Sequence, residues 1–294
     1  MAFSPSHRFA LVPLLVLGAV GCGDDEPGTP AKPSVAVTIP FEARVGGEPF
    51  ACGQRYTGLG TTKTAYEPQD FRLYVHDVRL VSDTGQEVPV DLTPDGRWQA
   101  EGVALLDFAD KKGLCSNGTA ETFTQLVGTV PEGTYRGLRF RLGVPFALNH
   151  QDVSTAPAPF NDPILFWGWR TGYLFVRIDG RTTGLPGGYF MHLGSTDCAP
   201  PPAGQTSGTA GCDFPNRPEV SLETFTPGQG KVVVDLAALL ADANLDLNAE
   251  VPNTSLGCMS QKEDPDCTPV FHRMGLSLDK QTPAPAAQSF IRAE

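Results

Sequence analysis

The stretch Phe71-Arg-Leu-Tyr-Val-His-Asp-Val-Arg-Leu-Val81 decides the fold class. It is rich in β-branched and aromatic residues and partly alternates apolar with polar side chains, which is typical of a β-strand. Turn residues at 82–86 and a second apolar run at 87–92 follow it directly. The sequence therefore predicts a β-hairpin at this point.

Short apolar runs separated by turn residues continue along the rest of the chain. Further strands are predicted over residues 137–144, 172–178, 188–193, 220–225 and 231–236, and short helices over 236–245 and 119–127. The 32 glycines and 27 prolines show no repeat period, which argues against collagen and against wholesale disorder. We expect a mainly β fold, an antiparallel β-sandwich or distorted barrel with one or two short helices and long disulfide-stapled loops.

Composition narrows the class of protein. A chain of 294 residues that is 40% hydrophobic can bury a sizeable core. Its 22 basic and 33 acidic residues give a net charge of −11, which repels phosphate backbones and argues against nucleic acid as a partner. No linker divides residues 35–294, so we expect a single β-rich domain there.

The N-terminus has the pattern of an export signal. Residues 1–21 contain Arg8 and then an apolar stretch too short to span a bilayer, which needs about 20 residues. Small residues directly before Cys22 resemble a bacterial lipobox, in which the cysteine is lipidated, although an ordinary cleaved signal is the alternative. The polar, Pro-rich residues 22–34 would then be a flexible tether. We expect a lipoprotein anchored to the membrane, in the bacterial periplasm or at the cell surface.

Six cysteines remain after Cys22, and an even set in an exported chain favours disulfides. They are Cys52, Cys115, Cys198, Cys212, Cys258 and Cys267. Local pairing would join the third to the fourth and the fifth to the sixth, leaving the first two together. The sequence does not choose among the possible pairings. A thiolate metal site is the alternative, but no CxxC spacing supports it.

Histidine is scarce and is the residue type that could bind a transition metal. His76 and His192 lie within predicted strands and His150 at a loop edge, while His272 lies in a Val-Phe-His-Arg segment. Two imidazoles on neighbouring strands could meet at one ion, and neutral imidazole suits copper, zinc, iron and nickel. Because no HxH or HExxH spacing is present, each could equally be a structural hydrogen-bonding residue.

Tryptophan is scarcer still, and two of the three indoles lie close together. Residues 164–175 form the densest aromatic cluster and contain Trp167 and Trp169, whereas Trp98 lies in a turn context. The pair would share a face of an extended segment. The cluster is open to two interpretations, ordinary core packing or an oxidisable, ligand-stacking site. No GxSxG, GxxxxGK[ST] or HExxH pattern points to an enzyme.

A series of phrases in a fixed order resembles one family over about residues 35–290. The phrases are Tyr74-Val-His-Asp-Val-Arg-Leu80, Ala104-Leu-Leu-Asp-Phe108, Cys115-Ser-Asn-Gly-Thr119, Leu138-Arg-Phe-Arg-Leu-Gly-Val-Pro-Phe146, Leu148-Asn-His150, Phe166-Trp-Gly-Trp169, His192-Leu-Gly-Ser195, Pro215-Asn-Arg217 and Gly257-Cys-Met-Ser260. They resemble the MbnP-type family, also described as the four-cysteine-motif member of the metallo-mystery pair system.

The resemblance implies a copper-binding protein that is not an enzyme. A dihaem partner of the MauG-like MbnH type would oxidise one tryptophan to kynurenine, which with histidines would hold a single copper ion. Carried onto this sequence, the tryptophan is Trp167 or Trp169 and the histidines are His76, His150 and His192.

Two other functions remain open at this point. One is a non-metal module outside the cytoplasm, a ligand-binding or adhesive β-sandwich that uses the aromatic cluster. The other is a self-sufficient enzyme such as a copper oxidase, which no visible substrate-site motif supports.

Overall fold

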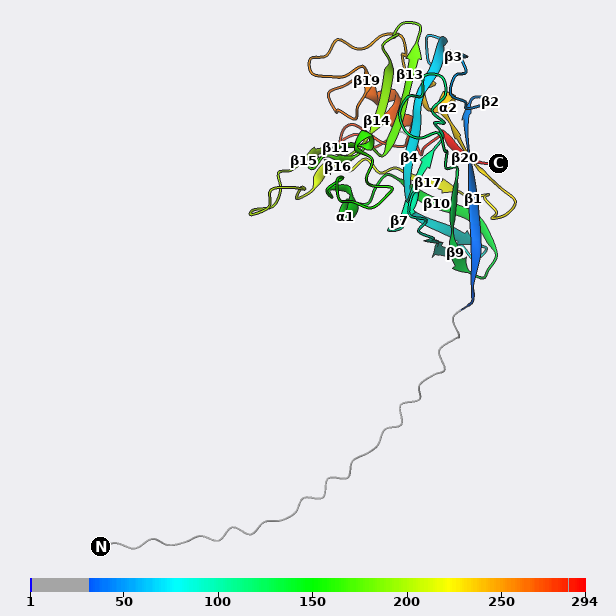
Figure 1. The fold of residues 1–294 in the computed structure, drawn as a ribbon, viewed down its shortest axis with the longest axis vertical. Coiled ribbons are helices and arrows are strands. Elements are labelled where there is room, and N and C mark those ends of the chain that lie inside the picture. The colour runs from blue at the N-terminus through cyan, green and yellow to red at the C-terminus, as the bar shows by residue number, and fades with distance from the viewer. Residues whose placement is uncertain (2–31, 285) are drawn as a thin grey trace. The chain divides into compact units, whose positions relative to one another are not determined.

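Strand β4 (Thr64–Ser82) is the longest strand and organises the larger of two sheets (Figure 1). The computed structural model describes residues 1, 32–284 and 286–294, so the predicted signal, Cys22 and most of the predicted tether lie outside the described residues. The predicted strand at 71–81 is confirmed as part of β4, and its predicted hairpin partner begins at β5 (Glu87–Pro89).

The larger sheet runs in the order β17-β10-β4-β13-β14-β19, with four further strands beside this path. Besides β4 and β5 its strands are β3 (Tyr56–Leu59), β7 (Gln99–Ala100), β8 (Val103–Asp107), β10 (Tyr135–Leu142), β13 (Val176–Thr182), β14 (Tyr189–Leu193), β17 (Glu219–Leu222) and β19 (Gly257–Cys258).

The smaller sheet runs in the order β20-β18-β1-β9-β6, with β2 beside β1. Its strands are β1 (Ser34–Val45), β2 (Glu48–Pro49), β6 (Asp91–Leu92), β9 (Gln125–Pro131), β18 (Val232–Asp235) and β20 (Ile291–Ala293). Two separate ribbons pair β11 (Phe166–Gly168) with β12 (Gly172–Tyr173), and β15 (Thr196–Cys198) with β16 (Cys212–Phe214).

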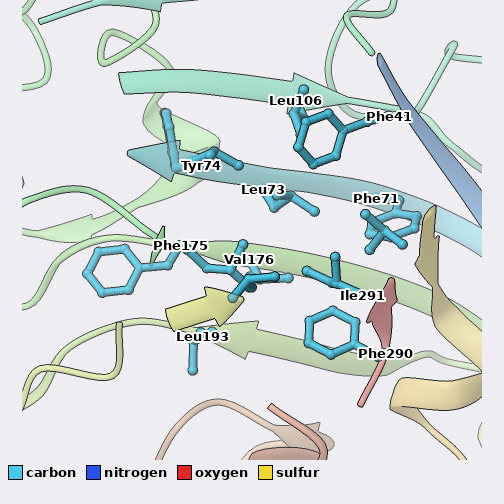
Figure 2. Close-up of a cluster of buried hydrophobic side chains, with 14 of the residues drawn as sticks. Phe41, Phe71, Leu73, Tyr74, Leu106, Phe175, Val176, Leu193, Phe290 and Ile291 are labelled. Atoms are coloured by element: carbon cyan, nitrogen blue, oxygen red, sulfur yellow. The ribbon is translucent and has the colours of Figure 1, made fainter. Parts of the chain in front are cut away.

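One hydrophobic core joins the two sheets into a sandwich. Figure 2 shows part of it, where Phe41 of β1 lies among residues of the larger sheet such as Phe71 and Leu73. The ring of Phe41 meets that of Phe140 in β10 edge to face, with centroids 5.7 Å apart. The sheets are mixed, because β18 lies parallel to β1 and β19 parallel to β14. They do not close into a barrel, so the sandwich is the correct one of the two predicted architectures.

The helices are short: α1 (Phe146–Asn149), α2 (Leu236–Leu239), α3 (Cys267–Arg273) and the single 3-10 turn η1 (Pro163–Leu165). The predicted helix at 119–127 is wrong. Residues 125–131 pair with β1 along their whole length, and this non-local pairing outweighs the local preference. The predicted helix at 236–245 is real only as far as Leu239, although Asp235 caps its start by accepting from the amides of Ala237 and Ala238.

All six remaining cysteines form disulfides with the local pairing. The bonds join Cys52 to Cys115, Cys198 to Cys212 and Cys258 to Cys267. The first spans 63 residues, the second links opposite residues of β15 and β16, and the third links β19 to the start of α3. With no thiolate left over among them, the alternative of a cysteine metal site is excluded.

Residues 33–294 form one compact unit. No helix in the part of the chain that the structure describes is long and apolar enough to cross a membrane.

Candidate metal centre

A row of charged side chains crosses one buried face of the larger sheet. Arg72 of β4 lies opposite Arg177 of β13, which lies opposite His192 of β14. Directly opposite residues in paired strands point to the same face, so these three side chains are neighbours. Asp70 and Asp179 are likewise opposite each other. This face lies opposite the one that carries Phe71 and Leu73, because side chains alternate along a strand.

The charges in this row pair with one another, and most are almost fully buried. Arg72 donates to Asp70 through Nε at 2.8 Å and Nη2 at 2.6 Å, and to Asp162 through Nη1 at 2.8 Å. Arg177 holds Oδ2 of Asp179 through Nε and Nη2, each at 2.8 Å, and its Nε lies 3.1 Å from Asp70. Charges buried in this way are tolerated because each is paired. The row of Asp162, Arg72, Asp70, Arg177 and Asp179, called here the charge ladder, ends at His192.

One ring nitrogen of His192 makes a hydrogen bond, and the other makes none among the described residues. Its Nε2 lies 2.7 Å from Oδ1 of Asp179. An ionised carboxylate only accepts, so Nε2 carries a proton, and in the neutral imidazole Nδ1 then keeps its lone pair. Nδ1 is buried and has no hydrogen-bond partner among the described residues. A histidine that donates one N–H to a carboxylate and leaves the other nitrogen free has the arrangement of a metal ligand.

Trp167 lies next to His192. Its ring centroid is 6.4 Å from that of the imidazole, at an interplanar angle of 48°. The indole is half-buried and packs on Gly194, two residues beyond His192. It also lines a cleft of about 360 Å3 together with Thr171, Met259 and other residues.

Trp169 and His150 form a second contact, through the backbone. Nδ1 of His150 donates to the carbonyl of Trp169 at 3.3 Å, while Nε2 lies 3.3 Å from the amide nitrogen of Asn149. His150 follows α1 as its C-cap, and its ring meets that of Phe146 edge to face at 5.0 Å. The side chain of Trp169 is 45% exposed. Trp167 lies within β11, whereas Trp169 follows its last residue, and the two indoles differ in exposure.

His76 is buried in β4, and its Nδ1 donates to the carbonyl of Gly143 at 2.7 Å. Burial, with a smaller contribution from the nearby guanidinium of Arg217, lowers the pKa of His76 to about 4, so the ring is neutral at pH 7. Burial and Arg217 also lower the pKa of His150. Arg217, which donates to the carbonyl of Val144 at 2.6 Å, therefore acts on both histidines.

The structure places the predicted site residues in three separate contacts. Trp167 meets His192, Trp169 meets His150, and His76 shares the influence of Arg217 with His150. His272 is exposed on α3, and Trp98 stacks on Phe123 in a different cluster. Within residues 32–284 and 286–294, no group of three or more His, Cys, Asp or Glu side chains is arranged to hold a metal.

The donors present fit a transition metal of the imidazole-binding class. Each of the three histidines donates one N–H to a carboxylate or backbone carbonyl, which leaves the other nitrogen unprotonated. The orphaned Nδ1 of His192 is the clearest such atom.

Sequence reasoning missed the charge ladder, although a signal was present. Asp70-Phe-Arg72 and Arg177-Ile-Asp179 each carry opposite charges two residues apart inside apolar strands. That spacing puts both charges of a pair on one face, where they must be paired if the face is buried.

Comparison with known proteins identifies one family. The family model described as MbnP matches residues 34–260. Among solved structures, MbnP from Methylosinus trichosporium superposes with a TM-score of 0.78 at 28% sequence identity, covering 89% of this chain and 98% of that one. No curated protein matches the chain. Because the family match covers most of the sequence and the solved structure has the same fold, this chain belongs to the MbnP family.

Proposed function

We propose that this protein is an exported copper-binding lipoprotein and not an enzyme. Histidines and a kynurenine would together hold the copper ion. A dihaem peroxidase-like partner would make the kynurenine from one tryptophan of this protein. Membership of the MbnP family supports the proposal. The observation that carries it is the contact of Trp167 with His192, whose buried Nδ1 has no partner among the described residues.

Trp167 is the better choice for the modified residue. Its ring is half-buried and lies beside His192, whose Nδ1 has no hydrogen-bond partner among the described residues. The ring of Trp169 is exposed, and the contact of this residue with His150 is made by its backbone carbonyl. Kynurenine keeps the benzene ring of the indole and gains an aryl amine. This amine would be a further nitrogen donor beside the imidazoles of the histidines. Nitrogen donors of this kind suit copper.

The modification is a four-electron oxidation with a hydrolysis. Cleavage of the C2–C3 bond of the indole inserts two oxygen atoms and gives N-formylkynurenine, and hydrolysis then releases formate. With peroxide as the oxidant, two molecules are consumed and two molecules of water form. The dihaem partner would supply the redox chemistry of this oxidation.

The protein's own residues would hold the ion. His192 would offer Nδ1, while His76 and His150 each have a nitrogen that is not protonated. Copper held there would supply one-electron redox chemistry or be carried as cargo.

The proposed location is the bacterial periplasm or the cell surface. Cys22 would carry the lipid anchor, and residues 22–34 would give the folded domain its reach. The three disulfides support an oxidising compartment. A net charge of −11 gives no support to a nucleic-acid partner.

The test is co-expression with a dihaem peroxidase-like partner, followed by peptide mass spectrometry and metal analysis after dialysis. We expect the peptide holding Trp167 and Trp169 to gain two oxygens and lose CO, and the protein to retain one copper ion. Trp167→Phe should abolish both results, while Trp98→Phe, the matched control in another cluster, should leave them unchanged. An unmodified peptide without retained copper would contradict the proposal and favour the non-metal binding module.

A further inference from the structure

We infer that Asp179 is a positioning residue, which fixes His192 with its proton on Nε2 and so makes Nδ1 the ligating atom. That Nδ1 binds copper rests on the function proposed above. That Asp179 fixes the proton on Nε2 does not.

The contact between the two side chains carries the first step. Asp179 is 1% exposed and His192 is 6% exposed, so water does not compete for their hydrogen bond. The bond of 2.7 Å runs from Nε2 to a carboxylate oxygen that only accepts. Since a neutral imidazole carries one N–H, the lone pair must be on Nδ1, which faces no hydrogen-bond partner in the described chain.

Asp179 is itself held in place. Arg177 occupies its Oδ2 with two donors at 2.8 Å, which leaves Oδ1 for His192. Arg177 in turn lies beside Asp70, and Asp70 is held twice by Arg72. A carboxylate bound on both oxygens cannot rotate away from the imidazole without breaking an ion pair.

The other end of the charge ladder holds the segment that carries Trp167. Arg72 donates to Asp162, and Asp162 caps η1 by accepting from the amide of Ile164 at 2.9 Å. Arg177 also donates to the carbonyl of Ile164 at 3.0 Å. Because η1 leads directly into β11, one set of buried charges positions both the histidine and the tryptophan of the proposed site.

Asp179→Asn separates positioning from simple packing. Arg177 requires an acceptor, so the amide oxygen of the new side chain should turn toward it and leave the NH2 group facing His192. The Nε2 atom must then accept, and the proton moves to Nδ1. The shape of the side chain is nearly unchanged, but the lone pair is on the wrong nitrogen for binding copper.

The first measurement uses apo protein labelled with 15N and made without any partner. Long-range 1H–15N spectra distinguish the two tautomers, and we expect Nε2–H for His192 in the wild type and Nδ1–H in Asp179→Asn. His76 and His150, which donate to backbone carbonyls, are internal controls and should not change. A wild-type His192 protonated on Nδ1, or an unchanged tautomer in a folded Asp179→Asn protein, would overturn the inference.

The second measurement is copper affinity after co-expression with the dihaem partner. Loss of such an outer contact weakens metal binding by about 10–100-fold, and we expect this for Asp179→Asn. The matched control is Asp107→Asn, another buried carboxylate of the same sheet that is not bonded to His192. Equal affinity in wild type and Asp179→Asn would overturn the positioning role. A wild type that binds no copper would count against the proposed function. The tautomer spectra would still test whether Asp179 fixes the proton of His192 on Nε2.

Discussion

The indole of Trp167 packs directly on the backbone of Gly194. A Cβ atom built on Gly194 would lie 2.5 Å from Cζ3 of Trp167, closer than side-chain carbons approach in proteins. The backbone of Gly194 is held on both sides, because its N–H donates to Ser260 at 3.1 Å and its carbonyl accepts from Asn216 at 2.8 Å. A side chain at this position would therefore press first on the indole, which is the nearest group.

We predict that Gly194→Ala displaces Trp167 from His192 while the protein stays folded. Tryptophan fluorescence should shift to the red as the ring becomes more exposed, and the yield of kynurenine with the dihaem partner should fall several-fold. Gly187→Ala is the control, since no described atom lies within 4 Å of a Cβ there. Equal fluorescence and equal yield in the two variants would contradict the proposed role of this contact.

The pairing of Asp70 with Arg72 should be important for stability. Both side chains are almost fully buried, and Asp70→Ala would leave the guanidinium with only Asp162. Removing one partner of a buried ion pair costs about 3–5 kcal/mol of unfolding free energy. The exposed pair of Arg97 and Glu121 is the control, and Glu121→Ala should cost less than about 1 kcal/mol. Denaturant unfolding of the three proteins measures the difference, and a similar cost for both variants would contradict this account.

Asp107 should make stability depend on pH. Its pKa is raised from 3.8 to about 7, mainly by burial and to a smaller extent by nearby Asp70 and Asp162, against the opposing effects of the Ala109 amide and Arg72. The folded state therefore binds the proton more tightly than the unfolded state. The stabilising effect of protonated Asp107 is complete below about pH 3.8 and is lost as the pH rises through about 7.

Asp107→Asn, which is neutral at every pH, should remove this dependence. Relative to wild type, the unfolding free energy of the variant should rise between pH 4 and pH 7 by up to about 4 kcal/mol. Denaturant unfolding at several pH values tests this expectation, and parallel pH profiles for the two proteins would rule it out.

The three disulfides should differ in accessibility to reductant. Cys198 and Cys212 are half-buried, whereas Cys115, Cys258 and Cys267 are fully buried. Graded reduction followed by alkylation and mass spectrometry should therefore label Cys198 and Cys212 first. The circular dichroism of the sheet should change little at that stage, because this bond links only β15 to β16. Earlier labelling of either buried bond would contradict the prediction.

Local patterns in the sequence were enough to predict the central strands of the larger sheet, but not the long β1 and β9 of the smaller sheet. The partial alternation and the β-branched content of residues 71–81 and 188–193 correspond to β4 and β14, because successive side chains of a strand point to opposite faces of the sheet. The same reasoning failed at 119–127, where pairing with the distant β1 decides the conformation. Helix α3 was missed because it is only seven residues long and begins at a disulfide cysteine.

The scarce residues of the proposed site could also be named from the sequence, since few histidines and tryptophans are present and the family phrases contain them. Their grouping could not. His192 and Trp167 are brought together by the pairing of β13 with β14 and by the charges that hold η1 to the sheet.

The sequence by itself determined the fold class and the family, and it supplied the residues proposed for the site. Tertiary structure decided that Trp167 lies beside His192, that Asp179 holds one nitrogen of this histidine, and that Trp169 is exposed. The physical reason is one of range. Periodicity and turn chemistry act between residues close in sequence, whereas strand register and buried charge pairing act between segments that only the folded chain brings into contact.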